Sequence, residues 1–309
     1  MHDIYNARDT ALSSSSSPST ADIARAGQYL RPLLSTTILT HIFDIELALD
    51  RALRILLSIW KGMPQHMQLP FYSFVTTYFP TFSFLESHWE TAGMPRGAIS
   101  LFFPVHALDA PMYQIQIPYV QCPRYYIMDV VASDYSRFIP STVFVPYKDR
   151  SSQRCRQVLD RINSMPLWFF GEDGSLGFPI EEGGRVRLLH GDDPLHLMNS
   201  QNKSITTLKV KFGWPNYQPT EKQIRASPNG TLNNLNRLAS LTAGAVRNFM
   251  GDEQKLEKLM IDKSPGFHPW QIGTQPGRIR ISDVILLGVI FVSDGAAMPL
   301  LAMMDSESA

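Results

Sequence analysis

The segment 190–196, with the sequence HGDDPLH, gathers the side chains of this chain that are best suited to catalysis. Two imidazoles and two carboxylates lie close together there: His190, Asp192, Asp193 and His196. Such groups can bind a divalent metal ion or exchange protons with a substrate. Their spacing lacks the His-Glu-x-x-His register of helical zinc sites, and Asp-Pro after an apolar run is typical of a turn. We therefore interpret the segment as a polar loop, and we keep a metal-assisted, hydrolase-like enzyme centred on these four residues as the alternative.

A second candidate site lies within residues 203–250, where seven basic residues accompany one acidic residue, Glu221. The rest of the chain carries the balancing negative charge, because Lys+Arg and Asp+Glu both number 28 in the whole sequence. An acidic peptide or a nucleic-acid backbone could bind such a surface, and exposed aromatic rings would add stacking area. The opposing interpretation is a solvated strand face, because the basic residues are interleaved along the chain. The candidate binding residues are Lys209, Lys211, Trp214, Tyr217, Lys222 and Arg225.

Other signatures of chemistry are missing from the sequence. It contains no nucleophile elbow, no Walker phosphate loop and no dinucleotide-binding fingerprint. Cys155 lies between two arginines that could make it reactive, but we interpret it as part of a short surface helix. We therefore expect no cofactor and no metal, and we identify no small-molecule substrate. With only Cys122 as a second cysteine, the chain has no disulfide framework and fits a reducing compartment.

The apolar segment 281–304 raises the question of a membrane span. A span needs about 20 mostly apolar residues. Asp294 interrupts this segment and would lie near the bilayer centre, which is costly. Residues 284–292 are rich in β-branched side chains, and the pair Asp294-Gly295 follows them. This pattern indicates two strands joined by a tight turn. We expect a buried hairpin and no membrane partner, with Pro299 placing the returning strand at an edge or a bulge. Membrane attachment through 281–304 is kept as a further alternative.

The N-terminal region is predicted to be mainly helical. The first 20 residues are serine-rich, carry charges in place of a signal peptide, and predict a disordered tail. Residues 33–62 have the apolar spacing of an amphipathic helix, whereas 63–104 are rich in aromatics and prolines without a clear period. Further along, period-two patterns predict strands at 113–117, 124–131, 142–147 and 185–190, with a helix at 151–163.

The C-terminal unit has the clearest pattern. Alternation in 206–214 predicts a strand with Lys209 and Lys211 on its outer face, and 221–226 supplies a second strand. Thr231 can cap a helix that ends at Gly251, and the apolar hairpin follows. The order β-β-α-β-β suggests a sheet crossed by one main helix, similar to a β-grasp roll, which is an analogy of fold without functional content. We predict an α+β protein divided into 1–20, 21–104, 105–200 and 201–305.

The segments TTLKVKFGWPNYQPTEKQIRA, TLNNLNRLASLTAGAVRNFM and RIRISDVILLGVIFVSDGAAMPLLAM resemble a family of uncharacterised proteins from mushroom-forming basidiomycete fungi. The resemblance covers the last third of the chain and includes no known functional signature. It implies a fungal, intracellular setting and supports the boundary of the C-terminal unit. WPNY stands where the family has Trp-Pro-Gly-Tyr, which leaves the turn geometry open.

These observations favour a non-catalytic interaction module located in the cytoplasm or the nucleus. The expected partner is an acidic protein or another polyanion at the basic strand face.

Overall fold

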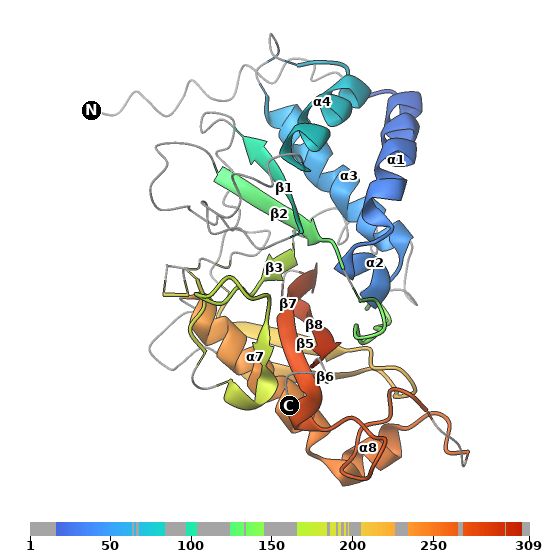
Figure 1. Cartoon of the computed structure of the whole chain (residues 1–309), viewed down its shortest axis with the longest axis vertical. Helices are drawn as coiled ribbons and strands as arrows, with labels where there is room; N and C mark the ends of the chain where they lie inside the picture. The colour runs from blue at the N-terminus through green and yellow to red at the C-terminus, as the bar shows by residue number, and fades with distance from the viewer. Residues whose placement is uncertain are drawn as a thin grey trace.

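The computed structural model places helices and a small hairpin in one half of the molecule and a larger sheet in the other (Figure 1). The structure describes residues 17–63, 65, 68–83, 97–103, 124–132, 134–144, 166–183, 186–189, 191–192, 195, 197, 205–225, 234–264, 268–293 and 295–304. The predicted strand at 113–117, the predicted helix at 151–163, both cysteines and Asp294 lie outside these residues. The α+β class that the sequence predicts is confirmed.

The described part of the N-terminal half contains four α-helices: α1 (Thr20–Leu34), α2 (Ile38–Ile42), α3 (Ile45–Gly62) and α4 (Phe71–Ser83). The single helix predicted within 33–62 is therefore divided, because Asp44 begins a new helix by accepting a hydrogen bond from the Leu47 N–H at 2.7 Å. Helix α4 forms in the aromatic segment for which the sequence showed no clear period. Apolar faces of α1, α3 and α4 pack together in one buried cluster.

The helical half also contains a sheet of two strands. Strand β1 (Ala98–Phe103) pairs antiparallel with β2 (Arg124–Val130), and β2 confirms the strand predicted at 124–131. Their pairing crosses the boundary predicted at residue 104. Residues 142–144 are not in a strand, and 186–189 contribute only an isolated bridge at Leu188. The strands predicted there do not form among the described residues.

The larger sheet has the order β3-β7-β8-β5-β6, with β4 also paired to β7. Its strands are β3 (Pro166–Trp168), β4 (Phe178–Pro179), β5 (Thr207–Phe212), β6 (Thr220–Arg225), β7 (Val284–Ser293) and β8 (Ala296–Met303). Strands β5 and β8 run parallel, and their other pairings are antiparallel. The predicted β-β-α-β-β order is confirmed, and the parallel pair β5–β8 lies at its centre with an antiparallel hairpin partner on each side. The pairing of β3 and β4 with β7 crosses the boundary predicted at residue 200.

Helix α7 (Leu235–Met250) lies across one face of this sheet, and the short α8 (Glu253–Leu259) follows it. The side chain of Asn234 caps α7 by accepting from the Arg237 N–H at 2.8 Å. The cap predicted at Thr231 is therefore wrong, because the helix begins later than the sequence suggested. Gly251 ends α7 as predicted, with its N–H bonded to the Arg247 carbonyl.

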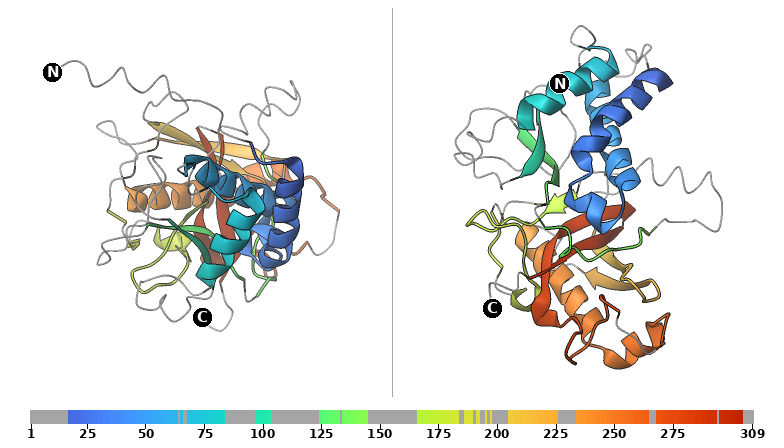
Figure 2. Two further views of the ribbon diagram at one scale, coloured as in Figure 1. Left: turned by 90° about the horizontal axis from the view of Figure 1, so that it is seen from above. Right: turned by 45° about the vertical axis from the view of Figure 1, so that its right-hand side comes forward.

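The β7–β8 hairpin is buried on both faces, with α7 on one side and the N-terminal half on the other (Figures 1 and 2). Along β7, Leu286 and Val289 pack in the cluster beneath α7, whereas Leu287 and Ile290 pack with residues of α2. Strands covered on both faces need apolar residues at every position, which explains the unbroken apolar run. Among the described residues, no helix is long and apolar enough to cross a bilayer.

Strand β8 is not an edge strand, so the first of the two alternatives predicted from Pro299 is wrong. The second, a bulge, is present close by, because the β7–β8 register shifts between Leu286 and Gly288, opposite Leu301 and Leu300. Strand β8 lies between β7 and β5, but its pairing with β5 involves only Ala296 and Ala297. Farther along, Phe138 bridges Ala302. Pro299 therefore occupies the interval between two partners, where the ladder does not use a backbone N–H at its position.

Arg51 links the two halves of the molecule. This α3 side chain is 7% exposed, and its Nη2 donates to the Phe291 carbonyl of β7 at 3.0 Å. Burial lowers the arginine pKa to about 10, so the guanidinium stays charged at neutral pH. A charged donor on a strand carbonyl gives the helical half a directional contact with the sheet.

Candidate binding surface

Leu188, Gly191 and Asp192 lie against the first turn of α7. The Asn236 side chain accepts from the Leu188 N–H at 2.9 Å and donates to Asp192 at 3.1 Å. The backbone N–H of Asn236 also donates to the Gly191 carbonyl at 2.9 Å. Asp192 is thus an exposed carboxylate held by a helix terminus.

The other members of the candidate catalytic cluster, His190, Asp193 and His196, lie outside the described residues. Their convergence on Asp192 therefore stays a hypothesis. In the part of the chain that the structure describes, no group of three or more His, Cys, Asp or Glu side chains could hold a metal ion.

The lysines of β5 point away from the core, as the alternation predicts. Leu208, Val210 and Phe212 are at most 4% exposed and face α7, whereas Lys209 is exposed and Lys211 is partly exposed on the opposite face. The outer face of β5 is therefore basic.

Both lysines already have an acidic partner on the neighbouring strand. Lys209 Nζ lies 2.8 Å from one carboxylate oxygen of Glu221, and Lys211 contacts the other. Hydrogen bonds from Lys209 and Lys211 hold the pKa of Glu221 below its ordinary value. Lys211 Nζ also lies 4.1 Å from the centroid of the Phe144 ring, a cation–π contact. These two ammonium groups are largely satisfied within the chain.

The remaining two basic candidates lie on opposite faces of β6. Lys222 is opposite Val210, so it shares the α7 face of the sheet; Arg225 is opposite Thr207, so it lies on the outer face. Both residues are exposed, and neither forms an ion pair with another described residue. The prediction of one basic face that includes Lys222 is therefore wrong, since the register divides the set.

Trp214 and Tyr217 are buried, so the prediction that they are exposed at the turn is also wrong. They are 4% and 3% exposed, with ring centroids 6.1 and 6.3 Å from that of Phe249 in α7. The Trp214 indole N–H donates to the Trp270 carbonyl at 2.7 Å. Between them, Asn216 adopts a left-handed φ of 65°, which asparagine tolerates. The turn folds back over α7, and both rings become part of the core.

Tyr217→Phe should destabilise the protein by about 1–3 kcal/mol, because the tyrosine hydroxyl accepts a hydrogen bond from the Ile272 N–H at 3.0 Å. Removing that acceptor leaves a buried N–H unsatisfied. Urea denaturation measures the loss. The control, Tyr135→Phe, alters a ring that is 49% exposed and should change the unfolding free energy by less than about 0.5 kcal/mol. Equal effects of the two substitutions would contradict the structural role of Tyr217.

Two grooves adjoin the β5–β6 hairpin. The first, of about 340 Å³, lies between β6 and the C-terminal part of α7. Its lining carries charges of both signs, with Glu221 and Asp252 beside Lys222, Arg247 and Lys255, and it includes apolar side chains of β5 and α7. The lining residues also include Thr220, Asn248 and Phe249.

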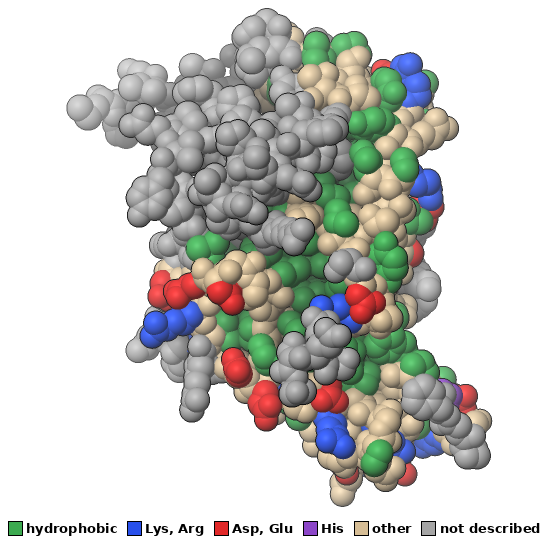
Figure 3. All heavy atoms as spheres, in the orientation of Figure 1, with side chains coloured by type: hydrophobic (Ala, Val, Ile, Leu, Met, Phe, Trp, Pro, Cys, Tyr) green, Lys and Arg blue, Asp and Glu red, His purple; other side chains and the backbone are tan. Residues whose placement is uncertain are grey.

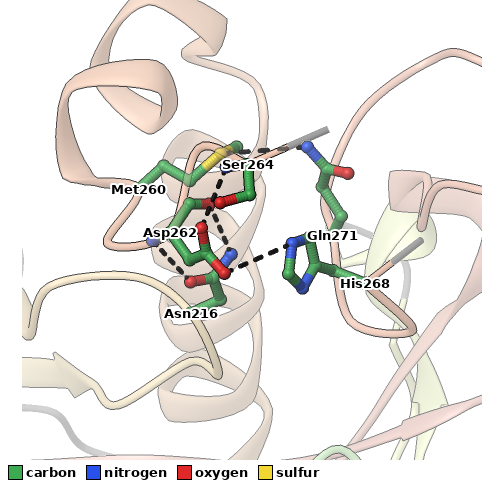
Figure 4. A network of polar contacts seen from close by, with 6 residues as sticks. All are labelled: Asn216, Met260, Asp262, Ser264, His268 and Gln271. Atoms are coloured by element: carbon green, nitrogen blue, oxygen red, sulfur yellow. Dashed lines mark hydrogen bonds and ion pairs between the residues drawn. The ribbon is translucent and has the colours of Figure 1, made fainter. Parts of the chain in front are cut away.

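The second groove, of about 480 Å³, lies between α8 and the loop 268–278. At its edge, Asn216 exchanges hydrogen bonds with the backbone of Asp262, and the Asp262 carboxylate lies 3.9 Å from His268 (Figure 4). The backbone N–H and the hydroxyl of Ser264, followed by His268, lower the pKa of Asp262. No sequence pattern predicted this groove, because its walls come from a short helix and an irregular loop.

Charges of both signs are interspersed over the face of the molecule drawn in Figure 3. A surface of this kind does not create the extended positive field that attracts nucleic acid. Comparison with protein families, with curated proteins and with solved structures found no match for this chain.

Proposed function

We propose that this protein is a non-catalytic interaction module that binds an acidic protein partner at the β5–β6 hairpin. One observation carries the proposal: β6 is the outermost strand of the sheet among the described residues, and it presents two exposed cations, Lys222 and Arg225, that lack an ionic partner there. Long basic side chains without local partners can form new ion pairs at little desolvation cost.

A cytoplasmic or nuclear location is part of the proposal. It rests on the cysteine content, because two cysteines in 309 residues fit a reducing compartment. A protein partner is favoured over nucleic acid because the neighbouring cations, Lys209 and Lys211, are already paired with Glu221.

The test is charge reversal at the two free cations. Lys222→Glu combined with Arg225→Glu should weaken binding of poly-L-glutamate about tenfold, since each exposed ion pair contributes up to about 1 kcal/mol. Binding by the wild-type protein should weaken as salt is raised, because screening shortens the range of exposed charges. Fluorescence anisotropy with labelled poly-L-glutamate measures both effects. Lys209 and Lys211 are avoided, because reversing them would place new carboxylates beside Glu221.

The matched control is Lys61→Glu with Lys258→Glu, which changes the net charge equally at exposed positions on α3 and α8. It should bind poly-L-glutamate nearly as well as the wild type. Equal losses in the two double variants, or wild-type binding that is indifferent to salt, would refute a site at β6.

A further inference from the structure

Strand β6 ends the sheet, and its outer side offers unpaired backbone groups. Its six residues pair with β5 from Thr207↔Arg225 to Phe212↔Thr220. Among the described residues, no strand or isolated bridge lies on its other side. Each residue of a strand presents its N–H and C=O to one side or the other, so an edge strand can accept a further strand.

The two faces beside this edge have different surroundings. On the α7 face, Lys222 borders the groove of about 340 Å³, together with Lys255 and with Asp252, whose carboxylate caps α8. On the outer face, Arg225 and Gln223 are exposed next to the Lys209–Glu221 ion pair. A chain laid along β6 would therefore meet a cation on each face of the sheet.

Cations on both faces of β6 suit a partner that binds as an additional strand of the sheet. Lys222 and Arg225 are three positions apart, an odd number, which is why the pleat sends them to opposite faces. An added strand alternates its own side chains in the same way and can place one carboxylate on each face.

We propose that β6 binds its partner by strand addition, and that the partner segment is an extended acidic peptide. This inference rests on the proposed function and specifies its binding mode. Backbone hydrogen bonds to the free edge of β6 supply affinity, and carboxylates at an odd spacing select the segment through Lys222 and Arg225. The groove beside α7 accommodates the side chains that point toward the helix.

The probe is a peptide, Thr-Val-Glu-Val-Thr-Glu-Val-Thr, with fluorescein on its amino terminus and an amidated carboxyl terminus; its two glutamates are three positions apart. Two derivatives carry backbone N-methyl groups on alternate residues, one on the odd positions and the other on the even positions. Each derivative loses the N–H donors of one peptide edge only. In strand addition a single edge faces β6, so one derivative should bind at least tenfold more weakly than the other in fluorescence anisotropy.

A fourth peptide of the same composition, with its glutamates two positions apart, tests the charge spacing. It should bind the wild-type protein several-fold more weakly than the parent peptide does. The protein variant Lys222→Glu with Arg225→Glu should bind the two peptides with equal affinity. Equal binding by the two methylated peptides, or no binding of the parent peptide, overturns strand addition.

The two proposals fail separately. If poly-L-glutamate binding still depends on salt and on the two cations while the methylated peptides are equivalent, the acidic site stands and the strand mode is excluded. If charge reversal has no effect on either probe, both proposals are excluded.

Discussion

Ile290→Asp is expected to unfold the protein or prevent it from accumulating in folded form. Ile290 is 0% exposed in the middle of β7, where it is paired with Pro166 on one side and Met298 on the other. Its side chain belongs to the cluster that joins the sheet to α2. An unpaired buried carboxylate costs about 3–5 kcal/mol, a large part of a typical stability of about 5–15 kcal/mol.

Circular dichroism melts and the yield of folded protein measure this effect. The control is Ile261→Asp, at a side chain that is 64% exposed, where the change should stay within about 0.5 kcal/mol. A cooperative wild-type-like melt of Ile290→Asp would show that β7 is not part of the core. Such a result would also reopen the question of how the apolar hairpin is covered.

The second large effect concerns Asp129, a buried carboxyl between β2 and α2. It is 2% exposed, and one of its oxygens accepts from the N–H groups of Val130 and Leu39, at 2.8 and 3.3 Å. Its other oxygen is buried without a hydrogen-bond partner among the described residues. Burial raises the pKa to about 7, and the hydrogen bonds that the carboxylate accepts oppose this only in part.

The sign of the pH dependence follows from that raised pKa. Between about 4 and 7 the folded protein keeps a proton that the unfolded chain has lost, so stability falls as pH rises through this window and levels off above it. The gap between the ordinary pKa of 3.8 and about 7 corresponds to a loss of roughly 4 kcal/mol.

Asp129→Asn should therefore flatten the pH profile of stability. The amide keeps an acceptor for the two N–H groups and carries no charge, so its unfolding free energy should rise relative to the wild type by up to about 4 kcal/mol between pH 4 and pH 8. Denaturation curves at a series of pH values measure this difference. The control, Asp134→Asn, should show no comparable rise between pH 4 and pH 8, because hydrogen bonds from Ser136 lower the pKa of that exposed carboxyl and it stays ionised throughout this window. Parallel profiles of wild type and Asp129→Asn would disprove the pKa assignment.

Local periodicity was sufficient to predict the elements of the C-terminal unit. Strand β5, helix α7 and the β7–β8 hairpin each carry a repeating apolar pattern in consecutive residues, and a pattern of this kind records which side of an element is buried. The lysines of β5 could be oriented for the same reason. Helix α4 and the division of 33–62 into separate helices could not be predicted, because aromatic residues without a period and a single capping aspartate give weak signals.

The candidate site depended on contacts between segments that are distant in the chain. Trp214 looked like an exposed turn residue, and only its packing on Phe249 and its bond to Trp270 place it in the core. Lys222 and Arg225 lie in a strand that the sequence predicts, but only the β5–β6 register shows which face of the sheet each side chain occupies. The sequence by itself determined that residues 284–292 are buried in a strand. Only the tertiary structure decided which elements bury them: α7 covers one face of the strand and α2 covers the other. No local pattern in the sequence encodes which helix packs on which face.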